Sequence, residues 1–220
     1  MGAAKETEQS RKKRLENILA ALQRKYPEAP LALRFTSGFE LLIAVILSAQ
    51  CTDQRVNQVT QHLFSEYGTP EDYLRAPLEK LEEQIKSTGF YRNKAKSIVA
   101  CCRMLVDQFG GKVPEDIDEM VKLPGVGRKT AAMVLGNAYG LQQGIAVDTH
   151  VSRVAQRLQL SQAKTPEKIE LDLMALVPRE QWTWLSNAFI LHGRETCKAR
   201  GPLCKDCVVE SWCPFDAKTL

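Results

Sequence analysis

The sequence predicts an all-α fold. Apolar residues recur three and four positions apart in segment after segment, which is the period of an amphipathic helix. Proline and acidic residues stand together where several of these segments begin, as in the first turn of a helix. No stretch alternates apolar and polar residues for long enough to indicate a strand. At 220 residues, the chain can form one large helical domain or two small ones.

Two helices are expected within the first fifty residues. Residues 11–25 carry leucine and isoleucine on one stripe and predict an amphipathic helix. Residues 39–50 (FELLIAVILSAQ) are apolar nearly all round, which is typical of a buried helix. Ser37 and Glu40 have the spacing of a capping box at the start of this second helix.

The remaining helices are expected from their starts and their apolar stripes. Residues 95–109 predict one helix, and Val151, Val154 and Leu158 stripe another after Asp148. Further helix starts are predicted at Thr52 or Asp53, at Thr69-Pro70, at Pro77, at Pro114 and at Thr165-Pro166.

The stretch from residue 123 to 148 is the most informative part of the chain. It begins with the turn LPGVG and runs directly into the apolar helical segment RKTAAMVLGNAYG. Gly125 and Gly127 allow the turn backbone angles that are closed to other residues. A turn that opens a helix aims unpaired N–H groups outward, and three cations flank this one: Lys122, Arg128 and Lys129. A phosphate site is therefore favoured over an ordinary helix connection.

Charge and apolar patterning limit the class of protein. There are 30 Lys and Arg residues against 26 Asp and Glu, a net charge of +4, so nucleic-acid contact requires local basic patches. Three segments qualify: residues 92–103, 122–129 and 194–205. No apolar run approaches a membrane span, and the basic N-terminal segment lacks the apolar region of a secretory signal. We therefore expect a cytoplasmic, nucleoid-associated protein with no membrane partner.

Four of the seven cysteines form a metal-binding pattern. Cys197, Cys204, Cys207 and Cys213 read C-x6-C-x2-C-x5-C within 17 residues. Without a secretion signal, thiols at this spacing predict a metal centre and not disulfides. Four thiolates suit zinc and iron–sulfur clusters equally, so spacing alone leaves both open. The other three, Cys51, Cys101 and Cys102, have apolar neighbours and are interpreted as packing residues.

Lys129 and Asp148 are the candidate catalytic pair. Lys129 lies in the first turn of its helix, where the helix dipole, Arg128 and partial burial are expected to favour the nucleophilic amine. Its alternative role is a plain phosphate contact. Asp148 follows the apolar run Ile145-Ala146-Val147 and precedes a helix, so its alternative role is an N-cap. A cap would also fix the direction of the carboxylate, so the two roles are compatible.

The segment LPGVGRKTA, followed about 20 residues later by VDTHVSRV, closely resembles the helix–hairpin–helix family of DNA glycosylases and AP lyases. The resemblance extends from about Phe39 to Cys213. It implies a two-domain fold: a six-helix domain at residues 31–141, and an iron–sulfur cluster domain made of residues 1–30 and 142–220. The ligand cleft of the family lies between the two domains.

The resemblance also implies the chemistry. The matching lysine, Lys129, attacks the sugar C1′ of a damaged nucleotide, and the matching aspartate, Asp148, assists. A Schiff base forms and β-elimination breaks the strand. The four cysteines match the loop that holds a [4Fe–4S] cluster in this family. The expected substrate is double-stranded DNA with oxidised pyrimidines or abasic sites, bound by a monomer.

DNA-contacting positions follow from the resemblance as well. Gln50 and Phe90 match two loop positions that enter the duplex, although a helix-end polar residue and a packed aromatic are their plainer roles. The other expected contacts are Leu123, Gly125, Val126, Gly127, Arg128, His150, Lys198 and Arg200. Two positions depart from the family pattern: Phe90 stands where many relatives carry an aliphatic residue, and Val121 stands where some relatives have a glutamate.

Two other functions stay open on sequence grounds. Monofunctional adenine mismatch glycosylases share the scaffold and the cluster, but they lack the lysine and carry an extra C-terminal domain. A non-catalytic iron–sulfur DNA-binding protein would not need both Lys129 and Asp148. The pair therefore favours a bifunctional glycosylase and lyase.

Overall fold

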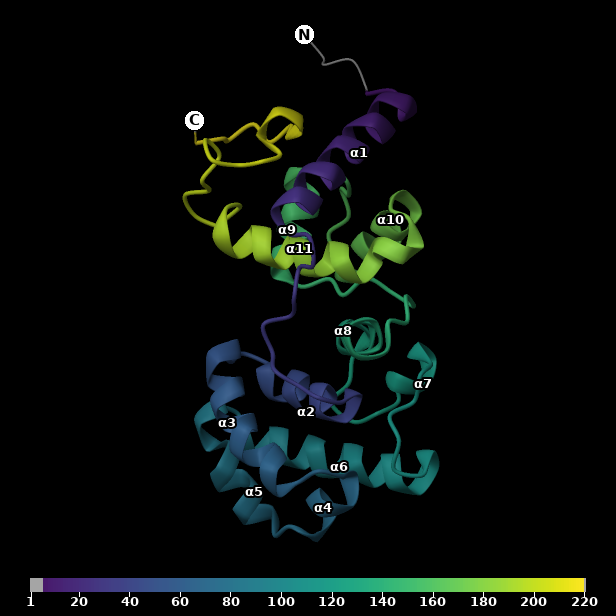
Figure 1. Cartoon of the computed structure of the whole chain (residues 1–220), viewed down its shortest axis with the longest axis vertical. Coiled ribbons are helices and arrows are strands. Elements are labelled where there is room, and N and C mark those ends of the chain that lie inside the picture. The colour runs from purple at the N-terminus through teal and green to yellow at the C-terminus, as the bar shows by residue number, and fades with distance from the viewer. Residues whose placement is uncertain (1–5, 220) are drawn as a thin grey trace. The chain divides into compact units, whose positions relative to one another are not determined.

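The structure is a computed structural model that describes residues 6–219, and within this range all regular elements are helices (Figure 1). The all-α prediction is confirmed. Residues 1–5, the start of the basic N-terminal segment considered for targeting, lie outside the described residues. None of the described helices combines the length and the apolar character that crossing a membrane would require.

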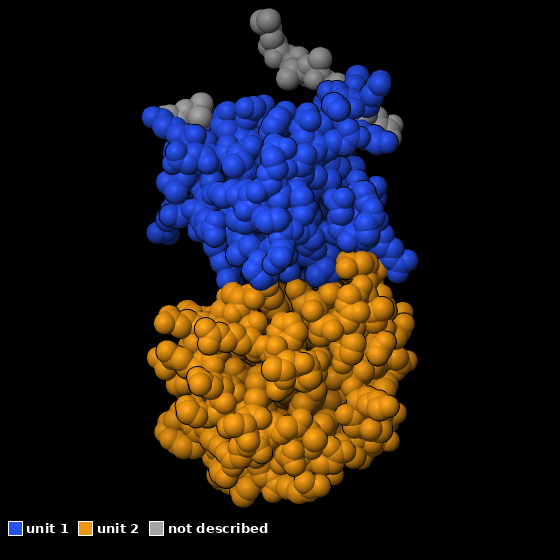
Figure 2. All heavy atoms as spheres, viewed as in Figure 1, with its two compact units in different colours: residues 1–30, 145–220 blue, residues 31–144 orange. Residues whose placement is uncertain are grey.

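The chain divides into two compact units (Figure 2). Unit 1 combines residues 1–30 with residues 145–220, and unit 2 is the continuous stretch 31–144. The first thirty residues thus belong with the last third of the chain, although more than a hundred residues separate them in sequence.

Unit 2 is built around one buried helix, α2 (Gly38–Ser48), in which every residue from Leu41 to Leu47 is buried. Helices α3, α6 and α8 each pack against α2. The other elements of this unit are α3 (Asp53–Glu66), α4 (Pro70–Arg75), α5 (Leu78–Ile85), η1 (Lys86–Thr88), α6 (Tyr91–Phe109), α7 (Ile117–Met120) and α8 (Arg128–Tyr139). The expectation that residues 39–50 form a buried helix is confirmed, except that the helix ends at Ser48.

Most helix starts follow the predicted chemistry, although α1 (Glu8–Lys25) begins at Glu8 and not at residue 11, and α7 begins at Ile117, three residues after Pro114. The Thr52 hydroxyl caps α3 by accepting from the Arg55 N–H at 3.3 Å. At α2, Ser37 Oγ accepts from the Glu40 N–H, but the Glu40 carboxylate reaches the Thr36 N–H at 2.6 Å. The expected capping box is therefore only half formed. Helix α6 begins at Tyr91, four residues before the predicted start.

Unit 1 contains α1 (Glu8–Lys25), α9 (Thr149–Arg157), α10 (Pro166–Leu176), η2 (Arg179–Gln181), α11 (Trp182–Glu195) and η3 (Glu210–Trp212). Helices α9 and α11 pack closely on each other, and α10 packs on α9. Helix α11 was not predicted from the sequence. It continues directly from η2 without a side-chain cap and without an acidic residue in its first turn, so the usual start signals are missing.

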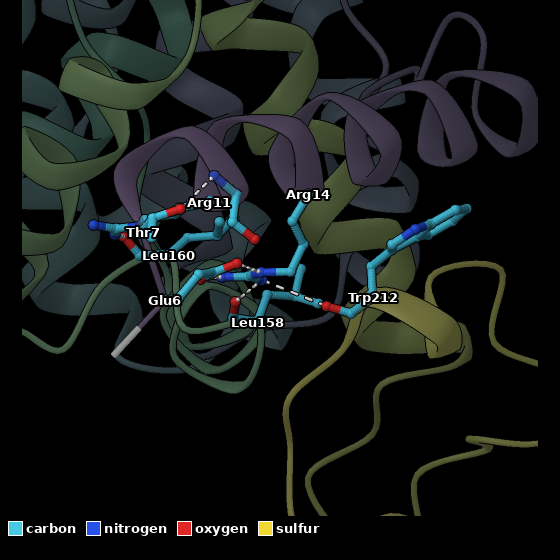
Figure 3. Close-up of polar contacts among 8 residues, drawn as sticks. Glu6, Thr7, Arg11, Arg14, Leu158, Leu160 and Trp212 are labelled. Atoms are coloured by element: carbon cyan, nitrogen blue, oxygen red, sulfur yellow. Dashed lines mark hydrogen bonds and ion pairs between the residues drawn. The ribbon is translucent and has the colours of Figure 1, made fainter. Parts of the chain in front are cut away.

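Two arginines fasten α1 to the rest of unit 1 through main-chain carbonyls (Figure 3). Arg14 Nη1 donates to Leu158 O at 2.7 Å, at the end of α9, and to Trp212 O at 3.4 Å. Arg11 Nη2 donates to Leu160 O at 2.8 Å. Glu6 pairs with the other side of the Arg14 guanidinium, and this hydrogen bond holds the pKa of Glu6 below its usual value. Arg14 therefore joins the N-terminal helix to two distant segments.

Replacing Arg14 by methionine should lower the stability of unit 1. The variant keeps an apolar stem but leaves the carbonyls of Leu158 and Trp212 without their charged donor. Hydrogen bonds from charged groups contribute about 1.5–3 kcal/mol each. The exposed Lys12→Met is the matched control, because it removes a cation from the same helix without breaking such a contact. Thermal melts that place both variants at the wild-type Tm would contradict this assignment.

Candidate functional site

The hairpin turn joins α7 to α8 and depends on Gly125. The Leu123 carbonyl accepts from the Val126 N–H at 3.0 Å, which closes the turn. Gly125 has φ +80°, and a Cβ there would lie 3.0 Å from the Ser97 Cβ. Gly127 instead has φ −92° and ψ 174°, an ordinary extended conformation, and a Cβ there would meet nothing. The expectation that the backbone angles require glycine is thus right for Gly125 and wrong for Gly127.

The turn presents an uncapped helix N-terminus. No side chain caps the first N–H groups of α8, and its first turn holds no acidic residue. Arg128 and Lys129 are both exposed at this start, so the partial burial expected for Lys129 is absent. The side chains of Leu123 and Val126 are buried, which leaves only their backbone for contact with a ligand. The start of α8 therefore combines a helix N-terminus that has no side-chain cap with exposed cations.

Asp148 caps α9, as expected. Its Oδ1 accepts from the N–H groups of both His150 and Val151, each at 2.8 Å. The side chain is half-buried, and both of these bonds use the same oxygen. The cap fixes the direction of the carboxylate while engaging one of its two oxygens. Lys129 belongs to unit 2 and Asp148 to unit 1.

Arg153, which the sequence analysis missed, connects the start of α9 with α11 and the first cysteine. Its Nη2 donates to Gly193 O at 2.9 Å and lies 3.1 Å from His150 Nδ1. Its Nε donates to Cys197 O at 3.0 Å. Gly193 makes room for this arrangement, because a Cβ there would lie 2.9 Å from the His150 Cβ. The only feature of the sequence that could have indicated this role of Arg153 is its position one helical turn after His150.

The four predicted ligand cysteines line one small cavity in unit 1: Cys197, Cys204, Cys207 and Cys213. All four are free thiols and half-buried. Burial raises the pKa of Cys207 and Cys213, so these thiols stay protonated unless a metal displaces the proton. His192 Nε2 lies 3.6 Å from Cys207 Sγ, and burial lowers the pKa of this histidine to about 4. The donor set therefore suits a thiolate-bound metal group.

Across residues 6–219, no three His, Cys, Asp or Glu side chains are grouped as ligands around a single metal ion. The four cysteines instead share the cavity with apolar side chains, among them Leu158, Leu203 and Val209. Of the three cysteines that were interpreted as packing residues, two are buried as expected. Cys101 and Cys102 are fully buried, and burial raises the pKa of Cys101 to about 12, whereas Cys51 is only half-buried.

Arg157 shapes the loop between the first two cysteines. Its Nη1 lies 3.3 Å from Cys197 Sγ and donates to Lys198 O at 2.7 Å. Its Nη2 donates to Ala199 O at 3.2 Å, and its guanidinium stacks 4.6 Å from the centre of the Phe215 ring. These contacts fix the loop backbone, from which the side chains of Lys198 and Arg200 project into solvent. Arg157 was also missed by the sequence analysis.

Gln50 and Phe90 lie on two exposed turns of unit 2. Gln50 follows the end of α2 with φ 52°, and Phe90 precedes α6 with φ 49°, so both occupy the left-handed region. Phe90 is 62% exposed, which excludes the plainer role of a packed aromatic. Few non-glycine residues adopt this conformation, and it is enriched where function requires it.

The chain matches known DNA repair proteins over most of its length. Residues 43–179 match the model of the HhH-GPD superfamily of base excision DNA repair proteins. Endonuclease III of Bacillus subtilis (strain 168) is 48% identical over 202 residues, which covers 91% of this chain and 92% of that protein.

Two solved structures agree with this result. A non-covalent complex of endonuclease III with DNA superposes with a TM-score of 0.88 at 46% identity, covering 93% of this chain and 95% of that chain. A trapped covalent intermediate of endonuclease III with DNA gives the same TM-score and identity, covering 93% of this chain and 96% of that chain. The chain therefore belongs to the HhH-GPD superfamily, and within it to the endonuclease III family.

The two hairpin glycines should respond differently to leucine. Gly127→Leu places its side chain in open space, so it should cost about 1 kcal/mol or less of stability, mainly at the cap. It should nevertheless weaken binding to all undamaged duplexes alike, because the contact that we expect it to block is with phosphate. Gly125→Leu, the matched comparison, should lose roughly 1–3 kcal/mol of stability through its strained φ. Fluorescence anisotropy with several duplex sequences, together with thermal melts, measures both effects. Weakening confined to one lesion would mean that the hairpin reads bases.

Proposed function

We propose that this protein is a base-excision-repair DNA glycosylase with AP lyase activity, which removes oxidised pyrimidines from duplex DNA. The observation that carries the proposal is the start of α8, where the exposed Lys129 follows an uncapped hairpin. The trapped covalent intermediate between a family member and DNA supports a covalent step. Asp148, held by its cap at the start of α9, supplies the carboxylate that this chemistry needs.

The proposed reaction begins when the damaged nucleotide leaves the base stack. The neutral amine of Lys129 attacks C1′, the bond to the base breaks, and the base leaves with the electron pair and takes up a proton. Asp148 offsets the positive charge that develops on the sugar and relays the proton. Opening of the sugar ring gives a Schiff base at C1′. Loss of a C2′ proton then expels the 3′ phosphate and breaks the strand.

The DNA contacts are proposed from the exposed groups. The hairpin backbone at Gly127 and the N-terminus of α8, which has no side-chain cap, would bind a phosphate. Gln50 and Phe90, on their exposed turns, would fill the space left by the extruded nucleotide. His150, held next to Arg153, and the loop cations Lys198 and Arg200 would contact the flanking backbone. The protein would act as a monomer on chromosomal DNA in the cytoplasm.

For the four cysteines we propose a [4Fe–4S] cluster. The support is the shared cavity, the four free thiols and the family to which the chain belongs. Bound there, the cluster would act structurally, because it would fix the loop that carries Lys198 and Arg200. We also propose that unit 2 is the six-helix domain of the family and unit 1 its cluster domain.

Substitution of Lys129 and Asp148 tests the reaction. Lys129→Gln should abolish borohydride trapping on an abasic duplex while keeping the fold, because an amide cannot form a Schiff base. Asp148→Asn should lose most base excision at little cost in stability, since Asn caps as well as Asp. Asp148→Ala should lose excision and also about 1 kcal/mol of stability. Single-turnover excision on a thymine glycol duplex and thermal melts measure these effects.

The control pair is Asp116→Asn and Asp116→Ala, because Asp116 caps α7 in the same way and has no proposed role in the reaction. If Asp148→Asn excised thymine glycol at the wild-type rate, Asp148 would be a cap alone. If wild-type protein excised the base without forming a trapped adduct, the enzyme would be a monofunctional glycosylase. DNA binding without excision or strand cleavage would reject catalysis altogether.

Metal analysis tests the cluster. Purified protein should be yellow-brown and contain about four irons and matching acid-labile sulfide per chain. Cys204→Ser should lose much of this iron, whereas Cys101→Ser should retain it, because Cys101 lies in the core of unit 2. Colourless protein with one zinc per chain would contradict the proposal.

A further inference from the structure

A buried lysine connects the two turns that carry Gln50 and Phe90. Lys94 is only 6% exposed, and its Nζ donates to Leu47 O and to Thr88 O, both at 2.8 Å. Leu47 lies in the last turn of α2, three residues before Gln50. Thr88 ends η1, two residues before Phe90. One ammonium group therefore binds the main chain just before each of the two turns.

Burying a lysine at position 94 costs free energy, and a side chain that only filled space would not require this cost. It lies in the first turn of α6, where the helix dipole disfavours a cation. Burial lowers the pKa of Lys94, which reflects the cost of removing its charge from water. Both bonds use main-chain carbonyls, so no carboxylate offsets this cost through them. Methionine would fill the same space without the free-energy cost of burying a charge, so the charge of Lys94 has a function other than packing.

The two acceptors explain how the charge is accommodated. Carbonyls in the last turn of a helix lack intrahelical partners and carry partial negative charge, so they attract cations. Leu47 O and Thr88 O are both at such ends. Lys94 satisfies the two ends at once, which fixes the direction in which the chain leaves each helix.

The segments that follow need such support because both are strained. Gln50 and Phe90 have φ of 52° and 49°, and such conformations cost on the order of 1–3 kcal/mol each. The Ser48 carbonyl accepts from the Cys51 N–H at 3.1 Å, which closes the first turn. The Phe90 carbonyl accepts from the backbone N–H of Lys94 at 3.1 Å. Lys94 thus holds the second turn with both its backbone and its side chain.

We propose that Lys94 is a positioning residue that couples the turn carrying Gln50 to the turn carrying Phe90. Together the two turns form one preorganised wedge for the space left by an extruded nucleotide. This inference rests on the proposed function, because that function gives the two exposed side chains their role. A rigid wedge enters the duplex without losing further conformational freedom, which favours the damaged site over intact DNA.

Lys94→Met tests the coupling, because methionine keeps the length of the side chain and removes both hydrogen bonds. We expect affinity for a duplex with a tetrahydrofuran abasic-site analogue to fall on the order of tenfold. Affinity for the undamaged duplex should stay unchanged, since the phosphate contacts are elsewhere. 2-Aminopurine placed opposite the analogue should show a smaller fluorescence change on binding. The exposed Lys112→Met, in the same unit, is the control for lost charge.

A double-mutant cycle with Phe90→Ala separates positioning from stability. If Lys94 acts through the wedge, the double variant should lose less than the sum of the two single losses. Additive losses, or equal weakening on both duplexes, would overturn the proposal. If Lys94→Met does not fold, Lys94→Gln takes its place, and full retention of lesion preference in that variant would also overturn it.

The preference of the wild-type protein for the abasic duplex distinguishes failure of the coupling from failure of the proposed function. Failure of the wild type to prefer the abasic duplex would reject the proposed function and the coupling together. A wild-type preference that survives in folded Lys94→Met would reject the coupling alone.

Discussion

The ends of helices leave backbone N–H and carbonyl groups without partners, and several candidate functional residues of this protein lie at such ends, among them Lys129, Asp148, Gln50 and Phe90. An all-α chain has no sheet edge to organise a site, so its irregular segments must be fixed at helix termini. The N-termini carry the proposed reactive residues: Lys129 lies at the start of α8, which has no side-chain cap, and Asp148 caps the start of α9. This difference suits α8 to an external anion, whereas the first amides of α9 are satisfied within the chain.

The carbonyl ends are held by cations from elsewhere in the chain. Lys94 binds the ends of α2 and η1, and Arg14 binds the end of α9. Arg153 reaches the last turn of α11, and Arg157 reaches the loop that follows the same helix. Lys94, Arg153 and Arg157 each fix backbone that precedes or carries a candidate contact, whereas Arg14 fastens α1 to the rest of unit 1. The positive charges of this structure therefore have two roles, since some face solvent and others hold the backbone behind them.

The sequence predicted those features whose signals are local. The Asp148 cap depends on a side chain and two N–H groups within three residues, and the cysteine spacing is local too. Lys94 and Arg153 were not identified, because their acceptors are up to 47 and 44 residues away and are main-chain carbonyls. A carbonyl has no sequence signature. Helix α11 was missed because it lacks a side-chain cap. The prediction that Gly127 needs a glycine conformation was wrong, because of the two hairpin glycines only Gly125 has a positive φ.

The pairing of α1 with the last third of the chain has a consequence for synthesis on the ribosome. Unit 2 is continuous and can fold as soon as it has emerged, whereas the apolar stripe of α1, with Leu15, Ile18 and Leu22, has no partner until α9 and α11 have been made. During that interval the nascent chain carries an exposed apolar helix ahead of a folded unit. The arginines in the first half of α1 give this helix a strongly charged face during that interval. Synthesis of α9 and α11, and not that of α1, therefore sets the earliest moment at which unit 1 can close.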